Sequence, residues 1–420
     1  MNITNKLFIN TIIYGISGSF VALIPLLLLP FMTRNLSQSD YGSALFFSAI
    51  LTMILPFIGF GSANAISVRF FQLSRDKFNS YLWSCMSIIC LSSLFILLFF
   101  FIGRSYVSNF LAIPFIWFFI AAITACFWGI SQACCILFIA KKDAYKYLLI
   151  NLVISFTTIL FSIISIKFLS LSWKGFAWAL FLGHLFAASL SLLLVYKDTK
   201  FSVINRDYIN DSIRFGLPIL FHSVSMSLIS YFDRVIITNN LGLEELARYS
   251  VAFQIALILN FSAQAFNKAF VPWLYKNLKS GSYQAKVKIV KGTYFIFSAI
   301  AIFTILFCFI LKFLILYIAG EQYIDVYHIA IIIAVAGAFN AAYLMVVNYI
   351  FYAGKTFMLG IISVSVATIF IALSLFMVPI FGLEGASFSF LIANFILFIL
   401  VWILAQKSFS MPWFSRSIFN

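Results

Sequence analysis

Ionisable side chains inside otherwise apolar segments are the residues of this sequence that could do chemistry. Asp233 and Arg234 are neighbours in one apolar segment, Lys268 lies in the next, and Arg69 lies at the end of an earlier one. An ionisable residue inside a membrane span costs about 2.5–3.5 kcal/mol on insertion scales, so it is usually retained for a functional reason. These four residues are therefore the first candidates for a site.

The chemistry that these residues suggest is the binding of an anion. Lys and Arg hold phosphate groups through charge-assisted hydrogen bonds, so a cavity containing Arg69 and Lys268 would suit an anionic head group such as a pyrophosphate. Asp233 is a carboxylate well inside a predicted span, which makes it the candidate for coupling to H⁺ or Na⁺. Two alternatives remain open: Asp233 and Arg234 could form a buried structural pair, and the other cations could extend to the membrane interface.

Uncharged polar residues accompany the charged ones at helical spacing. Asn260, Gln264 and Asn267 share one helical face with Lys268, and His222 lies among regularly spaced serines in the preceding segment. Such a face either lines an aqueous cavity or packs against another helix, where small residues allow close approach. We predict Asn260, Gln264, Asn267 and His222 as polar residues of a cavity.

The elements that must position these residues are membrane-spanning helices. Hydrophobic residues make up 64% of the 420 positions, charged residues only 9%, and Phe occurs 53 times. A water-soluble domain cannot hide that much apolar surface, and a helix needs about 20 apolar residues to cross a bilayer. The sequence therefore predicts an all-α polytopic membrane protein of about twelve transmembrane helices. The apolar runs are residues 8–33, 41–66, 80–102, 112–140, 146–169, 175–196, 213–239, 246–275, 289–318, 325–352, 357–380 and 385–406.

The distribution of charge predicts the orientation. Lys and Arg total 27 against 12 Asp and Glu, and most of the Lys and Arg fall on segments that share one side of the membrane with the N-terminus. Because Lys and Arg collect in cytoplasmic loops, both termini are predicted to be cytoplasmic. This explains the excess of positive charge without nucleic acid as a partner. The six cysteines lie in apolar runs without CxxC spacing, so we expect them to pack as small hydrophobic side chains and to form no metal site. We expect no cofactor apart from a coupling ion.

An internal repeat predicts the domain organisation. Thr33-Arg34-Asn35-Leu36 follows the first run, and Thr238-Asn239-Asn240-Leu241 follows the seventh. Six spans per half give both halves the same orientation, an arrangement typical of transporters with a cavity between two lobes. We predict an N-terminal lobe (1–196), a cytoplasmic linker (197–212), a C-terminal lobe (213–406) and a cytoplasmic tail (407–420).

Several motifs resemble those of Wzx-type polysaccharide flippases. The segment from Pro30 to Gly42, which reads PFMTRNLSQSDYG, resembles the first external loop of that family. Asp233-Arg234, followed by Asn240-Leu241-Gly242, resembles its seventh span. The segments 353–356 (AGKT) and 382–386 (GLEGA) fit its patterns around span eleven and before span twelve.

The resemblance implies a fold, a substrate and a place in the cell. Members of the MOP superfamily have two six-helix lobes arranged as a V around a cavity. The implied activity moves an undecaprenyl-pyrophosphate-linked oligosaccharide, an O-antigen or capsule repeat unit, from the cytoplasmic to the periplasmic leaflet of the bacterial inner membrane by alternating access. The implied pyrophosphate ligands are, by position, Arg34, Arg69, Arg234 and Lys268. The implied partners are the lipid-linked substrate, the bilayer and other polysaccharide assembly proteins.

Three other functions share some of these features. A MATE-type ion-coupled multidrug exporter would share the fold, but it would favour an acid-rich cavity for cationic drugs. A membrane-embedded polymerase or ligase would need a large external loop, and the external loops here are short, so we predict no enzyme. A passive channel would need a filter-like loop or a charged ring, and the sequence shows neither.

Replacing Asp233 with Asn tests the coupling hypothesis. Because Asn keeps the shape of the side chain but cannot carry the negative charge, we expect Asp233→Asn to reduce transport and to abolish its dependence on an H⁺ or Na⁺ gradient. The measurement is translocation in vesicles with and without each gradient. Unchanged transport with unchanged ion dependence would remove Asp233 from this role.

Overall fold

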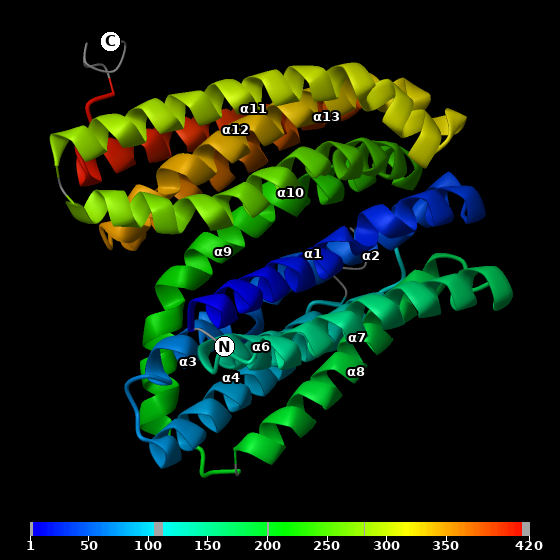
Figure 1. Ribbon diagram of the computed structural model, residues 1–420. Coiled ribbons are helices and arrows are strands. Elements are labelled where there is room, and N and C mark those ends of the chain that lie inside the picture. The colour runs from blue at the N-terminus through cyan, green and yellow to red at the C-terminus, as the bar shows by residue number, and fades with distance from the viewer. Residues whose placement is uncertain (1–2, 105–111, 200, 281, 414–420) are drawn as a thin grey trace. The chain divides into compact units, whose positions relative to one another are not determined.

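The computed structural model describes residues 3–104, 112–199, 201–280 and 282–413 (Figure 1). The regular secondary structure of these residues is entirely helical, with no strand among them. The chain divides into two compact units, which we call unit 1 (Met1–Ala247) and unit 2 (Arg248–Asn420). The division of the chain into lobes at residues 197–212 stays a prediction.

Unit 1 contains the helices of the first predicted spans. The most extensive packing within it pairs α7 with α8, α6 with α8, and α1 with α7, so these four helices form one bundle. The elements of unit 1 are α1 (Ile3–Asn35), α2 (Gln38–Ile54), η1 (Leu55–Gly61), α3 (Ala63–Arg69), α4 (Arg75–Ile102), α6 (Ile116–Ala140), α7 (Ala144–Ile163), η3 (Ile164–Phe168), α8 (Trp173–Asp198) and α9 (Arg206–Leu241).

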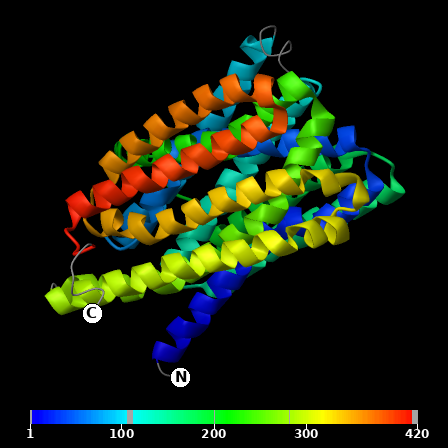
Figure 2. The same cartoon turned by 90° about the horizontal axis from the view of Figure 1, so that it is seen from above.

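Unit 2 is a second helical bundle. Both views show α11, α12 and α13 running side by side (Figures 1 and 2), and α12 packs against each of the other two. Its elements are α10 (Leu243–Ser280), which begins within the last residues of unit 1, then α11 (Tyr283–Ile318), η4 (Glu321–Val326), α12 (Tyr327–Tyr352) and α13 (Thr356–Ser408).

The membrane-spanning character predicted from the sequence is confirmed. Ten helical segments among the described residues are long and apolar enough to cross a bilayer. The last of them is 52 residues long, which at 1.5 Å per residue is about 78 Å and far exceeds a hydrocarbon core of about 30 Å. The protein is therefore an all-α multi-pass membrane protein.

Gly382 divides this last segment into two passes. Its backbone angles, φ 60 and ψ −137, lie outside the helical region. Glycine adopts such a positive φ without the steric penalty that a Cβ would cause. A Cβ on Gly385 would approach the backbone carbon of Met377 to 2.6 Å. Residues eight apart lie far from each other on a straight helix, so the chain folds back here, as Figure 2 shows. α13 thus accounts for the predicted runs 357–380 and 385–406.

Polar side chains define where several helices begin. Ser37, Asp143 and Ser282 each accept a hydrogen bond from a backbone N–H three residues later. Asn205 accepts one from the backbone N–H of Asp207 at 2.7 Å. Such caps satisfy backbone donors that have no partner within the helix. Because Asn205 starts α9 at residue 206, the connection between α8 and α9 is shorter than the linker expected at 197–212.

The second span is broken at η1. Gly59 and Phe60 have positive φ, 72 and 50, and Pro56 precedes them. A broken helix leaves backbone groups without helical partners, which is tolerated in a membrane protein only where the protein supplies others. Here the backbone N–H of Gly59 donates to Oγ of Ser92 on α4 at 2.7 Å. α2 and α3 are consequently two separately directed helices joined by a bonded turn.

The end of the described chain packs back on unit 2. Oη of Tyr294 donates to the carbonyl of Trp413 at 2.7 Å, and the Trp413 ring lies against Tyr349 and Trp402. Trp413 is only 4% exposed. Residues 409–413 of the predicted cytoplasmic tail are therefore part of the bundle, and residues 414–420 lie outside the described residues.

Backbone contact between η1 and α9 makes Gly216 sensitive to substitution. A Cβ at Gly216 would lie 2.6 Å from the carbonyl carbon of Gly61 and 2.8 Å from the amide nitrogen of Ser62. We expect Gly216→Ala to lower the free energy of unfolding by about 1–3 kcal/mol, as overpacking does. The measurement is thermal unfolding of the purified protein in detergent micelles.

Gly360→Ala is the matched control for this variant. Gly360 is also helical, but a Cβ there meets nothing within 4 Å. Because Ala is the better helix former by about 0.5–1 kcal/mol, we expect this variant to be as stable as the parent or slightly more stable. Equal effects of the two substitutions would contradict a close approach at Gly216.

Candidate functional site

The predicted site residues fall into two groups, one in each unit. Unit 1 holds five of them, and unit 2 holds the polar face of α10. Their shared cavity and their roles in binding stay predictions, and the structure gives the surroundings of each. The unit 1 residues are Arg34, Arg69, His222, Asp233 and Arg234, and those of unit 2 are Asn260, Gln264, Asn267 and Lys268.

Arg69 forms a two-point ion pair with Asp211. Its Nε donates to Oδ2 of Asp211 at 2.9 Å, and its second terminal nitrogen donates to Oδ1 at 2.6 Å. Oη of Tyr81 donates to the same Oδ2 at 2.9 Å. The pair is partly open to solvent, with side-chain exposures of 28% for Arg69 and 38% for Asp211. An anion that bound Arg69 would therefore have to replace or share this carboxylate.

The pair ties three elements together. Arg69 ends α3, Tyr81 lies in the second turn of α4, and Asp211 lies in the second turn of α9. Nearby, the backbone N–H of Asn205 donates to Oγ of Ser84 at 3.0 Å. These bonds hold the beginning of α9 against the helices that precede and follow the α3–α4 turn.

Asp233 and Arg234 neutralise each other inside unit 1. A terminal guanidinium nitrogen of Arg234 donates to Oδ1 of Asp233 at 2.7 Å, and the backbone N–H of Arg234 donates to the same oxygen at 2.8 Å. Asp233 is fully buried, and the Arg234 side chain is 7% exposed. The guanidinium also lies over the ring of Tyr231, 4.8 Å from its centroid. This is the geometry of the buried structural pair, which was the alternative to a coupling role.

The remaining two candidates of unit 1 occupy different positions. Arg34 is exposed in the last turn of α1, and His222 is partly buried in α9. His222 lies roughly 16 Å along α9 from Asp233, at 1.5 Å per residue. Along α9, His222 and the ion pair are therefore separate features.

In unit 2, the predicted polar face of α10 divides into a packed part and an exposed part. Asn260 is buried next to Gly337 of α12, and Oδ1 of Asn267 accepts a hydrogen bond from Nδ2 of Asn348 at 2.8 Å. Such bonds between helices help to hold membrane bundles together. Gln264 and Lys268 are exposed on the adjoining side of the helix. Packing against another helix therefore applies to Asn260 and Asn267, and a cavity lined by Gln264 and Lys268 stays a prediction.

The exposed side of α10 continues as a basic surface. Lys268, Lys276 and Lys279 are all exposed and fall within about one quarter of the helical circumference. Residues 246–320 contain no Asp or Glu. The backbone carbonyl of Lys268 is also polar and has no helical partner, because Pro272 lacks the N–H that would pair with it. An ammonium group and a freed carbonyl therefore occur at the same residue.

Comparison with known proteins places the chain in a family. The model of a family described as "Polysaccharide biosynthesis protein" matches residues 7–278, which is more than half of the chain. The chain belongs to the polysaccharide biosynthesis protein family.

Two relatives from Haemophilus influenzae match most of this member of the polysaccharide biosynthesis protein family. Protein 1 of the Lsg locus is 24% identical over 372 residues, which are 87% of this chain and 90% of the relative. An uncharacterized membrane protein is 25% identical over 352 residues, 82% of this chain and 83% of the relative.

Solved structures of MATE transporters share the fold of this family member. The MATE multidrug transporter DinF-BH, solved in complex with a ligand, superposes with a TM-score of 0.68 at 18% identity, covering 99% of this chain and 98% of the transporter. An inward-facing multidrug resistance MATE transporter of the MOP superfamily gives 0.67 at 15% identity, covering 92% and 94%. At such identities the likeness shows the fold alone. The fold is therefore the MATE-like helical fold that the sequence motifs indicated.

Three residues with buried or charged contacts in this polysaccharide biosynthesis protein were not predicted from the sequence: Tyr81, His184 and Asp211. Asp211 was assigned to a loop and Tyr81 to no role, although the Asn205-x-Asp207 start of α9 signals that residue 211 is helical. His184 of α8 is 2% exposed and stacks on Trp128 at a centroid distance of 4.7 Å. No periodic polar pattern in the sequence distinguishes it.

A double-mutant cycle tests the Arg69–Asp211 pair. Because the pair is two-point but partly solvated, we expect a coupling energy of about 1 kcal/mol between Arg69→Ala and Asp211→Ala. The measurement is the unfolding free energy of the two single variants and the double variant in detergent. Tyr81→Phe, which removes one hydrogen bond and leaves the ion pair, should cost less than either single variant. Additive effects would show that the two charges do not interact.

Proposed function

We propose that the protein is a flippase for an undecaprenyl-pyrophosphate-linked oligosaccharide. It moves this O-antigen or capsule repeat unit from the cytoplasmic to the periplasmic leaflet of the inner membrane by alternating access. The observation that carries the proposal is the exposed basic side of α10 in a chain that belongs to a polysaccharide biosynthesis family.

The surroundings of the cations support an anionic substrate and single out one residue. Arg69 and Arg234 are each paired with a carboxylate of unit 1. Lys268 is exposed, and it forms no ion pair with any residue of the described ranges. Its ammonium group can bind a phosphate oxygen, and the carbonyl freed by Pro272 can accept a hydrogen bond from a sugar hydroxyl. Lys268 is therefore the first pyrophosphate ligand that we propose, with Arg34, Arg69 and Arg234 as further candidates.

Alternating access is supported by the fold. Among the similar MATE structures, one is described as inward-facing and another, with a TM-score of 0.65 at 17% identity, as outward-facing. A fold that exists in both states in its relatives suits a carrier that opens to one side at a time.

Ion coupling through Asp233 would require the buried pair with Arg234 to open. A carboxylate that already holds a guanidinium has less to gain from binding H⁺ or Na⁺. Coupling is therefore a switch in which the ion replaces Arg234 at Asp233 and frees the guanidinium for an anion. Separating a buried pair costs free energy, so the exchange takes place only when the binding of the substrate anion to the freed guanidinium offsets that cost.

A MATE-type ion-coupled multidrug exporter is the second candidate. The shared fold favours it, and DinF-BH is described as a multidrug transporter. A cationic drug needs a carboxylate that is free to pair with it. In unit 1, Asp233 and Asp211 are both paired with arginines, so the charges fit an anionic substrate better.

Deletion and complementation in the native host test the proposed function. We expect loss of surface polysaccharide and accumulation of the lipid-linked oligosaccharide in the inner leaflet, with recovery on adding the parent gene. Complementation by Lys268→Ala should lower the translocation rate roughly tenfold or more, as loss of a hydrogen bond to a charged group does. The measurements are surface polysaccharide and accessibility of the lipid-linked intermediate to a periplasmic probe.

Lys312→Ala is the matched control. Lys312 is also an exposed lysine of unit 2, but it lies on α11, where its ammonium group is 5.7 Å from the ring centroid of Tyr327. We expect full complementation by this variant. Normal surface polysaccharide in the deletion strain together with raised drug sensitivity would overturn the flippase proposal in favour of an exporter.

A further inference from the structure

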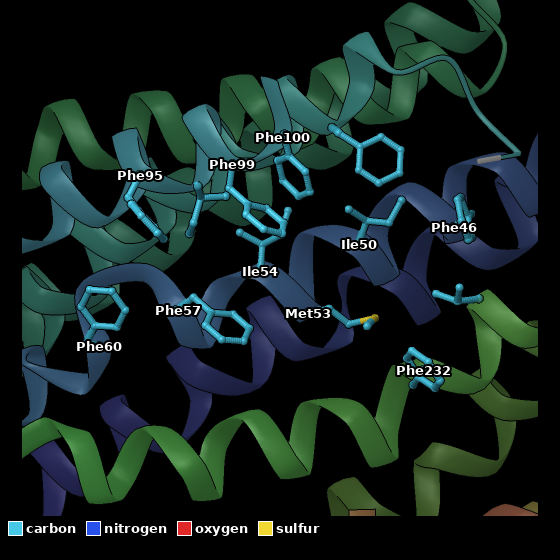
Figure 3. A pocket seen from close by; sticks show the side chains of 13 residues that line it. Phe46, Ile50, Met53, Ile54, Phe57, Phe60, Phe95, Phe99, Phe100 and Phe232 are labelled. Carbon is cyan, nitrogen blue, oxygen red and sulfur yellow. The ribbon is translucent and has the colours of Figure 1, made fainter. Parts of the chain in front are cut away.

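An apolar cavity of about 490 Å³ lies within unit 1. Figure 3 shows side chains of α2 and η1, of α4 and of α9 directed toward the same space. Thirteen residues line it, eight of them are Phe, and none has a nitrogen or oxygen atom in its side chain. The volume falls in the range of about 300–1,000 Å³ that is usual for ligand pockets. We call this cavity the Phe slot.

The Phe slot is elongated along α2. Its lining includes Phe46, Ile50, Met53 and Phe57, which recur every three or four residues and so share one helical face. From Phe46 in α2 to Phe57 in η1 the chain advances about 16 Å, or about three turns. Phe60, in η1, lies at the far end from Phe46 (Figure 3). This length suits an extended chain better than a compact ring system.

Several side chains at the edge of the Phe slot are apolar and exposed. Phe95 and Phe99 of α4 are 65% and 61% exposed, and Phe57 is 41% exposed. α4 is long and apolar enough to cross a bilayer. An apolar chain can therefore enter the slot over this edge without crossing a polar surface.

The lining excludes polar and charged ligands. A sugar or a pyrophosphate would lose its hydrogen bonds to water on entry and would find no partner, at a cost of several kcal/mol. A lipophilic cation would find aromatic rings but no free carboxylate. The nearest acid along α9, Asp233, lies beside the lining residue Phe232 but is held by Arg234 at 2.7 Å. Phe232 and Val235 face the slot, so the intervening ion pair is directed to other sides of the helix.

We propose that the Phe slot holds a segment of the polyisoprenoid chain of a lipid-linked substrate. This proposal rests on the proposed function and adds to it a binding site for the lipid tail, separate from the ligands of the head group. On the predicted topology the slot lies toward the periplasmic ends of α4 and α9. It therefore binds the tail when the head group has reached the periplasmic side.

The chemistry of the chain fits the slot. Each isoprene unit carries a methyl group and a double bond, and their C–H groups pack against the negative faces of aromatic rings. A saturated acyl chain lacks these branches and fills an aromatic cavity less completely. An undecaprenyl chain is also longer than the hydrocarbon layer of one leaflet, so part of it has to bend or to enter the other leaflet when its head group is at the interface, and a segment of it is available to the slot.

Photolabelling tests the proposal on the full chain in vesicles of phosphatidylethanolamine and phosphatidylglycerol. The probe is a polyisoprenyl diphosphate that carries a diazirine in its chain, and the labelled peptides are identified by mass spectrometry. We expect labelling of α2 and η1 between Phe46 and Phe57 and of α4 between Phe95 and Phe100, and we expect unlabelled undecaprenyl phosphate to suppress it. Met53→Trp, which fills the slot, should reduce the labelling roughly tenfold.

Leu91→Trp is the matched control variant. Leu91 is also an apolar residue, but it lies on α4, is 60% exposed and is outside the slot, so this variant should be labelled like the parent. A phosphatidylcholine with a diazirine in its acyl chain provides the second arm. Equal labelling of the slot by this phospholipid, without competition by undecaprenyl phosphate, would overturn the proposal in favour of ordinary membrane lipid.

Two further outcomes separate this proposal from the proposed function. Competition by tetraphenylphosphonium but not by undecaprenyl phosphate would make the slot a site for lipophilic cations. No labelling of the slot, in a protein whose deletion still traps lipid-linked oligosaccharide in the inner leaflet, would reject the tail site and leave the flippase intact. The parent protein supplies the decisive labelling, so the test does not depend on the folding of any variant.

Discussion

The need to satisfy freed backbone groups and charges without water is the constraint on which this structure depends. In hydrocarbon a backbone amide or a charge has no solvent partner, so the chain must supply one. The structure meets this demand in the same way at several depths. Ser92 accepts the amide freed at Gly59, Asp233 neutralises Arg234, and Asn348 bonds to Asn267. Each of these partners comes from a side chain inside the same unit.

This constraint also sorts the charged residues by what they can do. A cation that is already paired in the interior can bind a substrate only by exchanging its partner, and the exchange has a free-energy cost. Arg69 and Arg234 belong to this class. An exposed lysine such as Lys268 can bind an anion without breaking an ion pair. A cation in an ion pair binds the substrate only when the free energy of binding exceeds the cost of opening the pair, whereas an exposed lysine binds it without that cost. The two classes therefore suit different steps of transport.

The sequence was sufficient for the fold class because hydrophobic runs and charge bias are local properties. Its limits appear where partners come from distant segments. Asp211 lies 142 positions from Arg69, and no periodicity connects them, so Arg69 looked like an unpaired cation. On α10 the spacing of Asn260, Gln264, Asn267 and Lys268 gave one face correctly, but only the packing of α12 divides that face into bonded and exposed residues. The Phe slot was equally hidden, since 53 phenylalanines in the sequence do not reveal which eight converge.

The return of residues 409–413 onto unit 2 has a consequence for the biogenesis of the protein. Trp413 fills a space between Tyr294, Tyr349 and Trp402, which belong to three different helices. Tyr294 and Tyr349 precede Trp413 by more than 60 positions, so α11 and α12 leave the ribosome before Trp413 does. The contacts of Trp413 with these two helices therefore form late in synthesis, on a surface that α11 and α12 have already made. Assembly of this part of unit 2 depends on a segment that is made after the helices it packs against.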